Sequence, residues 1–151
     1  MAMRILLLGK NGQLGWELQR TLASLGELTA LDYPDIDFSK PDDLRRLVHH
    51  SRPQVIVNAA AYTAVDRAES EIDLCRAINA DAPAVLAAEA QRVDAAFIHF
   101  STDYVFDGLK GSPYLEEDQA NPLNVYGETK LAGECAAAEA TQAYWIFRTS
   151  W

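Results

Sequence analysis

The fold is decided by Arg4-Ile5-Leu6-Leu7-Leu8-Gly9-Lys10-Asn11-Gly12-Gln13-Leu14-Gly15, near the start of the chain. The short apolar run before the first glycine predicts a buried strand. Leucines at positions 14, 18, 22 and 25 have helical spacing and predict a helix over residues 16–25. A strand, a glycine turn and a helix in this order can bind a diphosphate, because backbone N–H groups and the positive end of the helix dipole meet there.

The three glycines have separate expected tasks in this turn. Gly9 would make the turn, Gly12 would let the main chain approach phosphates, and Gly15 would let the helix pack closely on the strand. Their spacing, G-x-x-G-x-x-G, differs from the commonest dinucleotide-binding pattern, G-x-G-x-x-G. Asp32 strengthens the prediction, because it follows a predicted strand at the place where a dinucleotide site puts an acid on the adenosine ribose. The alternative is a ligand-free turn with a solvated Asp32.

Composition narrows the class of protein. The chain has 151 residues, enough for one domain with a core, and 49% of them are hydrophobic. Its net charge of -9 disfavours nonspecific nucleic-acid binding, which needs clustered basic residues. Its apolar runs are short of membrane-spanning length, and the first of them leads straight into the glycine turn, unlike a signal peptide. We therefore expect a cytoplasmic protein without nucleic-acid or membrane partners.

Predicted strands and helices alternate along the whole chain. Strands are expected at 4–8, 28–31, 55–57, 96–100 and 143–148, and helices at 16–25, 40–51, 66–79, 82–92 and 126–140, with a long loop at 107–122. This alternation predicts an α/β fold, a Rossmann-type doubly wound parallel sheet with helices on both faces. Ligands bind such sheets beyond the carboxyl ends of the strands, which gathers Gly12, Asp32, Ala60 and residues 101–103 at one edge.

A tyrosine and a lysine supply candidate acid–base chemistry. Tyr126 and Lys130 are four residues apart on a predicted helix, so they share one face. A nearby ammonium lowers the pKa of a phenol, which could then exchange a proton with a carbonyl oxygen. Ser101 or Thr102, at the end of the fourth strand, could hydrogen-bond that oxygen, and strand alternation leaves a place for one of the two. The alternative is a surface Tyr and Lys on an amphipathic helix.

Four blocks of sequence carry a family resemblance: residues 9–15, 58–66, 101–108 and 124–130. Together with Thr102, Tyr126 and Lys130 they resemble the extended short-chain dehydrogenase/reductase family and, more narrowly, its nucleotide-sugar reductases. The resemblance implies that NADPH or NADH reduces the 4-keto group of a dTDP-sugar, dTDP-4-dehydro-L-rhamnose, to give dTDP-L-rhamnose.

The resemblance also assigns residues to roles. The cofactor would contact Gly9, Gly12, Gln13, Leu14, Gly15, Asp32, Asp37, Phe38, Ala61, Tyr62, Thr63, Phe100, Tyr126 and Lys130. Tyr126 would donate the proton, while Lys130 would hold the nicotinamide ribose and tune Tyr126. The sugar would contact Thr102, Asp103 and Trp151. Glu17 would bind Mg²⁺ at the contact between the subunits of a homodimer, although an acid in a first helical turn is also favoured by the helix dipole alone.

Members of the resembled family are about twice as long as this chain. We therefore expect residues 1–151 to be an N-terminal NAD(P)-binding domain whose C-terminal substrate domain lies outside the chain, and we expect little reductase activity from the short chain alone. Two alternatives stay open. A nucleotide-sugar epimerase or dehydratase would recycle its cofactor instead of consuming it, and a non-catalytic regulatory subunit would not need the triad of Thr102, Tyr126 and Lys130.

Overall fold

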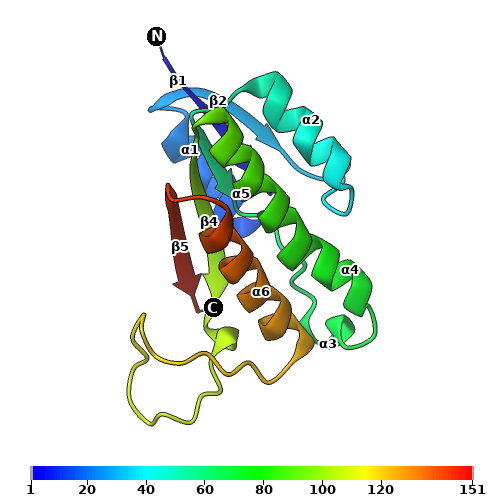
Figure 1. Cartoon of the computed structure of the whole chain (residues 1–151), viewed down its shortest axis with the longest axis vertical. Coiled ribbons are helices and arrows are strands. Elements are labelled where there is room, and N and C mark those ends of the chain that lie inside the picture. The colour runs from blue at the N-terminus through cyan, green and yellow to red at the C-terminus, as the bar shows by residue number, and fades with distance from the viewer. Residues whose placement is uncertain (1, 151) are drawn as a thin grey trace.

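The computed structural model describes residues 2–150, which form one parallel sheet with the strand order β2-β1-β3-β4-β5 (Figure 1). The strands are β1 (Met3–Leu8), β2 (Gly26–Leu31), β3 (Val55–Asn58), β4 (Ala96–Thr102) and β5 (Tyr144–Thr149). The helices are α1 (Gln13–Leu22), α2 (Pro41–Ser51), α3 (Val65–Ala68), α4 (Ile72–Arg76), α5 (Ala82–Val93) and α6 (Val125–Ala140). Among these described helices, none combines the length and the apolar character needed to cross a bilayer.

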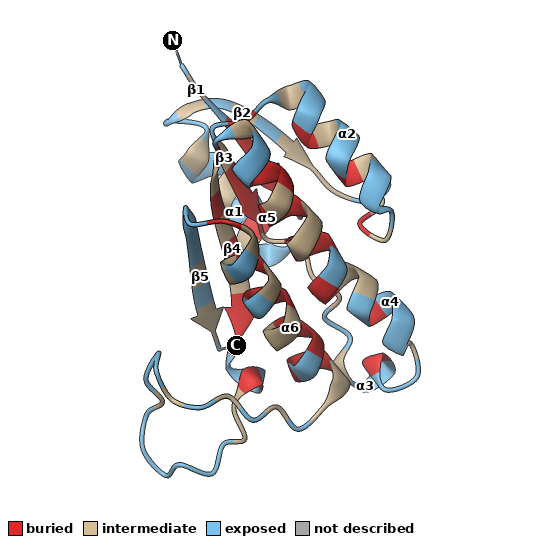
Figure 2. Cartoon of the chain, in the orientation of Figure 1, coloured by how far each residue is buried: buried red, intermediate tan, exposed pale blue. Residues whose placement is uncertain are grey.

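Helices cover both faces of the sheet, which confirms the predicted doubly wound architecture. Leu18 and Leu22 of α1 pack against the face that carries Ile5 and Leu7 of β1. The apolar sides of α2, α5 and α6 pack on the opposite face, and Figure 2 marks the buried residues of these helices in red. Because β1 is covered on both sides, four consecutive apolar residues, Ile5 to Leu8, are all buried, as the apolar run predicted.

Strand β1 lies at the point where the chain reverses its direction across the sheet. Its last residue, Leu8, is in register with Leu31 of β2 on one side and with Asn58 of β3 on the other. The chain passes from β1 to β2 in one direction and returns to β3 in the other. A crevice for a ligand opens at the carboxyl ends of strands where such a reversal occurs.

Several element boundaries differ from the sequence prediction. Helix α1 begins at Gln13 and ends at Leu22, three residues before the predicted end at Leu25. Leu25 lies in the turn before β2 and is 59% exposed, so its helical spacing was fortuitous. Strand β4 continues two residues beyond the prediction, to Thr102.

The predicted helix over 66–79 is divided into α3 and α4, and a π-helical segment, Ala77–Asp81, joins α4 to α5. The wider turn is marked by the N–H of Ala82, which bonds to the carbonyl of Ala77 five residues earlier. Pro83 lies at the start of α5 but inside this continuous helical run, where it cannot donate an i→i−4 bond and its ring crowds the carbonyl four residues earlier.

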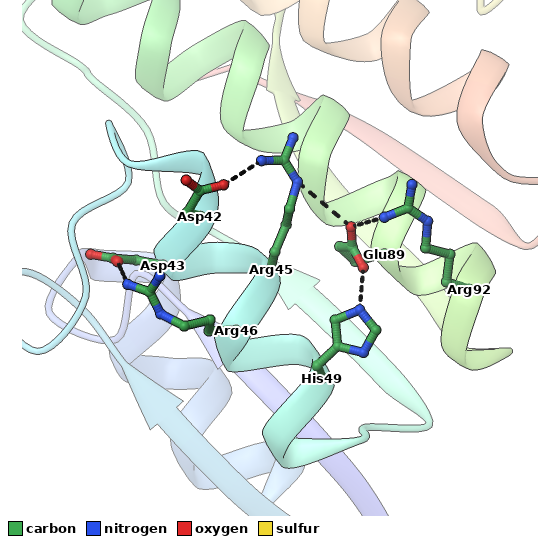
Figure 3. A network of polar contacts seen from close by, with 7 residues as sticks. All are labelled: Asp42, Asp43, Arg45, Arg46, His49, Glu89 and Arg92. Carbon is green, nitrogen blue, oxygen red and sulfur yellow. Dashed lines mark hydrogen bonds and ion pairs between the residues drawn. The ribbon is translucent and has the colours of Figure 1, made fainter.

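A buried carboxylate joins α2 to α5 (Figure 3). Glu89 of α5 is only 1% exposed, and two arginines and a histidine surround its carboxylate (Figure 3). Arg45 and His49 approach from α2, with Nε 3.8 Å and Nε2 3.1 Å from the Glu89 oxygens, while Arg92 pairs with it from the same helix. This cluster lies away from the carboxyl edge of the sheet and serves packing of the two helices.

Candidate active site

The glycine turn brings the start of α1 against the end of β1. The Gly9 N–H donates to the carbonyl of Leu31 at 2.9 Å, which ties the turn to β2. Gly9 has a φ of 86°, and a Cβ there would lie 2.5 Å from the backbone nitrogen of Ala60. A Cβ on Gly15 would lie 1.9 Å from the carbonyl oxygen of Gly9. These two contacts give Gly9 and Gly15 the turn and close-packing tasks predicted for them.

The N-terminus of α1 presents main chain rather than side chain to the space above it. Gly12 is the N-cap residue, and a Cβ there would have one neighbour, the Gly9 oxygen at 3.7 Å. The Asp32 carboxylate lies beside the turn, where it accepts hydrogen bonds from the N–H groups of Asn11 at 2.9 Å and Tyr33 at 2.8 Å. An open helix N-terminus beside an acid fits the diphosphate and ribose of a dinucleotide.

A cavity of about 520 Å³ lies at this edge of the sheet. Its lining comes from Asn11, Gly12, Gln13, Leu14, Gly15, Ala59, Ala61, Thr63, Phe100, Ser101, Tyr126, Lys130 and Thr149. The structure therefore brings together the glycine turn, the segment after β3, the end of β4 and the Tyr–Lys helix. These four segments were predicted separately and are far apart in the sequence.

Other predicted cofactor residues lie outside the lining of this cavity. Phe38 is buried in the core between the sheet and α2. The Asp37 carboxylate accepts hydrogen bonds from the hydroxyl and N–H of Ser39, which hold its pKa below the ordinary value. Tyr62 is bound through its backbone to Asn79 and through its hydroxyl to Glu71. Trp151, assigned to the sugar, lies outside the described residues.

Tyr126 lies at the start of α6 and is mostly buried. Burial raises the pKa of its phenol above the ordinary value, while a hydrogen bond with Thr102 acts in the opposite direction and the Asp103 charge raises it. The Thr102 hydroxyl also accepts from the N–H of Tyr104 at 3.2 Å and donates to Asp103 at 3.3 Å. The expectation that the Lys130 ammonium lowers this pKa is therefore not met, because desolvation is the larger effect.

Lys130 lies one turn further along α6 and is 2% exposed. Its Nζ donates to the carbonyl of Phe100 at 2.6 Å and lies 3.4 Å from Nε2 of His99. Burial lowers the pKa of this amine to about 8. The side chain is thus fixed against the end of β4, within the lining of the same cavity as Tyr126.

Two buried polar residues behind the cavity were not predicted from the sequence. Asn58 at the end of β3 and His99 in β4 are in contact, with Nδ2 of Asn58 3.2 Å from Nδ1 of His99. A histidine inside the apolar strand 96–100 was the available signal, because a buried polar side chain needs partners. Ser101, left open as an alternative to Thr102, lines the cavity, but its buried hydroxyl has no hydrogen-bond partner among residues 2–150.

The resemblance assigned Glu17 to magnesium, and the described residues form no group of metal ligands around it. Its carboxylate is exposed on α1 and accepts a hydrogen bond from Arg20 at 3.1 Å. Within residues 2–150, no group of three His, Cys, Asp or Glu side chains is arranged to hold a metal ion. Magnesium in proteins is usually held by one or two carboxylates and keeps several waters, so the assignment of Glu17 at a subunit contact stays a prediction.

The parallel sheet, the glycine turn and the Tyr–Lys pair define a Rossmann-type domain of the dehydrogenase/reductase class. Residues 3–151 match the family model described as the RmlD substrate binding domain. The chain belongs to this family.

Relatives with known names agree with this assignment. A dTDP-4-dehydrorhamnose reductase of Burkholderia thailandensis is 51% identical over 149 residues, which are 99% of this chain and 50% of that protein. The crystal structure of a dTDP-4-dehydrorhamnose reductase from Clostridium acetobutylicum has a TM-score of 0.95 and 42% identity, and the match covers 99% of this chain and 54% of that one. The Bacillus anthracis dTDP-4-dehydrorhamnose reductase, in complex with NADP, has a TM-score of 0.95 and 39% identity over 100% of this chain and 54% of that one.

The chain spans about half the length of the relatives that it matches. A more distant structure, the UDP-glucose 4-epimerase of Thermus thermophilus in complex with NAD, has a TM-score of 0.85 at 19% identity, covering 97% of this chain and 54% of that one. At 19% identity, the similarity to the epimerase shows a shared fold and nothing about function.

Proposed function

We propose that this chain is the cofactor-binding part of a reductase that uses NADPH or NADH to convert dTDP-4-dehydro-L-rhamnose to dTDP-L-rhamnose. The observation that carries the proposal is the single cavity lined by the glycine turn, Tyr126 and Lys130. The names of the relatives support the choice of substrate and the NADP-bound neighbour supports the choice of cofactor.

The cofactor would bind along the carboxyl edge of the sheet. Backbone N–H groups of Gln13 and Leu14, in the first turn of α1, would hold the diphosphate, and Asp32 would accept hydrogen bonds from the adenosine ribose. Lys130 would hydrogen-bond the nicotinamide ribose. When bound, the nicotinamide supplies the hydride for the keto carbon.

Tyr126 would supply the proton. Its raised pKa keeps the phenol protonated at neutral pH, so it can donate to the keto oxygen as the carbon is reduced. The carbonyl thereby gains one hydride and one proton to become an alcohol, and the phenolate left on Tyr126 regains a proton from solvent. Thr102, beside Tyr126, would hydrogen-bond the same oxygen and orient the sugar.

We assign the nucleotide-sugar contacts to Thr102, Asp103 and Trp151 together with the additional chain that the relatives carry. On this proposal residues 1–151 bind NADPH by themselves, and efficient turnover needs the second half. Titrating the 151-residue chain with NADPH by cofactor fluorescence tests the first part. An NADPH-consumption assay with dTDP-4-dehydrorhamnose, on the chain extended to the length of its relatives, tests the second.

Replacing the proton donor gives the sharpest mutational test. Tyr126→Phe keeps the ring and removes the hydroxyl, so in the extended protein turnover should fall by at least the ~10²-fold typical of a positioned acid. NADPH affinity should stay nearly unchanged. Tyr144→Phe, on β5, is the matched control and should keep full turnover. Equal turnover of Tyr126→Phe and the unaltered protein would refute the assignment of the proton donor.

The same assay separates the reductase from an epimerase, which shares this fold. An epimerase reoxidises its own cofactor, so it would convert a sugar nucleotide without net loss of NADPH. Consumption of one NADPH per product formed is the result expected here.

A further inference from the structure

We propose that Glu69 is a positioning residue, whose carboxylate holds the first turn of α6 and thereby fixes Tyr126 relative to the segment that would carry the cofactor. The proposal deepens the function given above and rests on it, because Tyr126 is the proton donor assigned there. Glu69 follows directly after α3 and lies three residues beyond the sequence block 58–66, so it has no part in the roles assigned above.

The start of α6 is held by two side chains. A helix leaves its first N–H groups without partners inside the helix, so they need acceptors from elsewhere. Asn124, the N-cap residue, accepts from the N–H of Gly127 at 2.8 Å. The N–H of Val125 instead donates to Oε1 of Glu69 at 2.9 Å, across 56 residues of sequence. A carboxylate suits this place, because the positive end of the helix dipole attracts it and a charged acceptor makes a stronger hydrogen bond than a neutral one.

Tyr126 is the next residue along α6, and it packs on the short helix that Glu69 ends. It belongs to a small apolar cluster with the buried Ala68 of α3 and Cys75 of α4. It also meets Tyr104 edge-on, with ring centroids 5.5 Å apart. A shift of the first turn of α6 would therefore move the phenol away from the contacts that place it.

The segment 59–63 leads into α3 and contributes to the wall of the cavity. Tyr62, in this segment, is fixed by Asn79, which binds its N–H and its carbonyl at 2.8 and 3.0 Å. The Tyr62 hydroxyl donates to Glu71, two residues after Glu69. The cavity wall, α3 and Glu69 are therefore tied together as one unit, and the Glu69 carboxylate joins that unit to α6.

Other contacts join α6 to this unit further along the helix. Oγ1 of Thr129 lies 3.2 Å from Sγ of Cys75 and 3.4 Å from Nδ2 of Asn79. These neutral contacts hold the second turn of α6. Glu69 binds the first turn, directly before Tyr126, through a shorter bond to a charged acceptor. Loss of Glu69 should therefore loosen the proton donor while leaving α6 as a whole in place.

Hydrogen exchange in the unaltered 151-residue chain, followed by nuclear magnetic resonance, tests the bond without any substrate. The Val125 amide should exchange about tenfold more slowly there than in Glu69→Ala, because a hydrogen-bonded amide must open before it exchanges. Glu69→Gln keeps an acceptor oxygen of the same reach, so it should keep most of this protection and separates the bond from the charge. Asp66→Ala, exposed on α3, is the matched control and should leave Val125 unchanged. Equal exchange of Val125 in the unaltered chain and in Glu69→Ala would overturn the proposal.

The kinetic test uses the protein extended to the length of its relatives. Misplacing a reacting group by about 1 Å can cost ~10²-fold in rate, and the contacts of Thr129 remain, so turnover of Glu69→Ala should fall about tenfold. NADPH affinity should stay nearly unchanged, because the segment 59–63 keeps its own contacts. Glu69→Gln should restore most of the turnover, and Asp66→Ala should keep all of it. Weaker NADPH binding with full turnover at saturation would overturn the role of Glu69 in positioning Tyr126.

A loss of stability alone would not give this pattern. Glu89→Gln, in the contact between α2 and α5, should destabilise the protein far from the cavity and keep full turnover. An equal loss of turnover in Glu69→Ala and Glu89→Gln would mean that Glu69 acts through stability only, and the proposal would be wrong.

Two further outcomes separate this proposal from the proposed function. An active reductase whose turnover is unaffected by Glu69→Ala would overturn the role of Glu69 alone. A protected Val125 amide in an extended protein without reductase activity would contradict the proposed function and leave the bond between Glu69 and α6 standing.

Discussion

Lys10 lies in the glycine turn, where its positive charge could favour binding of the 2′-phosphate of NADPH. Asp32 would repel that phosphate, and we expect the two residues to balance, with NADH and NADPH affinities within about a hundredfold, or 2.7 kcal/mol. In the structure, however, the Lys10 ammonium contacts the carboxylate of Asp35 at 2.6 Å. Part of its charge is therefore neutralised by that partner.

Removing this partner should shift cofactor preference. Asp35→Asn releases Lys10, so NADPH affinity should rise about three- to tenfold, a gain of roughly 1 kcal/mol typical of an exposed ion pair, while NADH affinity stays constant. Fluorescence titration with both cofactors measures the ratio. Asp73→Asn, on α4, is a charge-matched control. An unchanged ratio in Asp35→Asn would mean that Lys10 does not reach the 2′ position.

The buried amine of Lys130 should make stability depend on pH. The folded chain releases this proton near pH 8, whereas the unfolded chain keeps it up to about pH 10.4. Between these values the unfolded state binds more protons, so this contribution to stability increases from about pH 8 to about pH 10.4 and is level below about pH 8.

The difference in unfolding free energy between the unaltered chain and Lys130→Met should therefore grow in favour of the unaltered chain by about 2 kcal/mol from pH 7 to pH 9.5. Urea unfolding of both proteins at the two pH values gives this difference. Groups common to both proteins cancel in the comparison. A constant difference would show that Lys130 has an ordinary pKa.

At the residue scale, the sequence patterns predicted which side chains line the site, but they did not predict how burial changes the pKa values of those side chains. The four-residue spacing of Tyr126 and Lys130 predicted a shared helix face, and both residues line one cavity. The same spacing suggested that the ammonium lowers the pKa of the phenol. Burial of the phenol raises its pKa instead, and burial depends on tertiary packing that no local pattern reports.

Among the elements, the junction of β1 and α1 offers a matched pair of glycine substitutions. Gly15→Ala would put a Cβ 1.9 Å from the Gly9 oxygen, so α1 must shift, at a cost of about 1–3 kcal/mol or more. Gly12→Ala adds a Cβ at an ordinary 3.7 Å from that oxygen, so it should leave stability nearly unchanged. It should nevertheless weaken NADPH binding if the main chain at Gly12 approaches the diphosphate.

Thermal unfolding and NADPH titration of both variants separate the two effects. Loss of binding with intact stability in Gly12→Ala, and loss of both in Gly15→Ala, is the expected pattern. Full NADPH affinity in Gly12→Ala would move the diphosphate away from this turn.

The buried Glu89 carboxylate joins α2 to α5, so the packing of these two helices should depend on its charge (Figure 3). Glu89→Gln keeps the shape but turns an amide toward Arg45, Arg92 and His49, and we expect it to lower the unfolding free energy by about 1–3 kcal/mol. Urea unfolding measures the loss. Glu139→Gln, exposed on α6, is the control and should change stability by less than about 0.5 kcal/mol. Equal stabilities of the two variants would show that the buried charge contributes nothing to this packing.

The sequence predicted the existence and type of the main elements, because segments rich in good helix formers, such as the Ala, Glu and Leu of α6, leave little ambiguity. It did not predict the π-helical segment Ala77–Asp81, because a single wider turn is too short to be recognised from the spacing of hydrophobic residues. In the structure, this segment positions a side chain that holds a neighbouring loop. Asn79, within it, binds both the N–H and the carbonyl of Tyr62, at 2.8 and 3.0 Å, and so fixes the loop beside the cavity.

For the whole molecule, the alternation of strands and helices was sufficient to predict a parallel sheet, and the rule for ligands in such sheets placed the site at the correct edge. The strand order β2-β1-β3-β4-β5 was not predicted, because it depends on which apolar faces match in three dimensions. Core packing also decided which predicted residues reach the cavity, as the burial of Phe38 shows.

The same strand order has a consequence for how the protein is made. After β1 and β2 have paired, β3, β4 and β5 each join the open side of the sheet in the order in which they are synthesised. No strand has to be inserted between two that are already paired. A chain that leaves the ribosome N-terminus first can therefore fold as it grows, and each new strand meets an edge that is already in place.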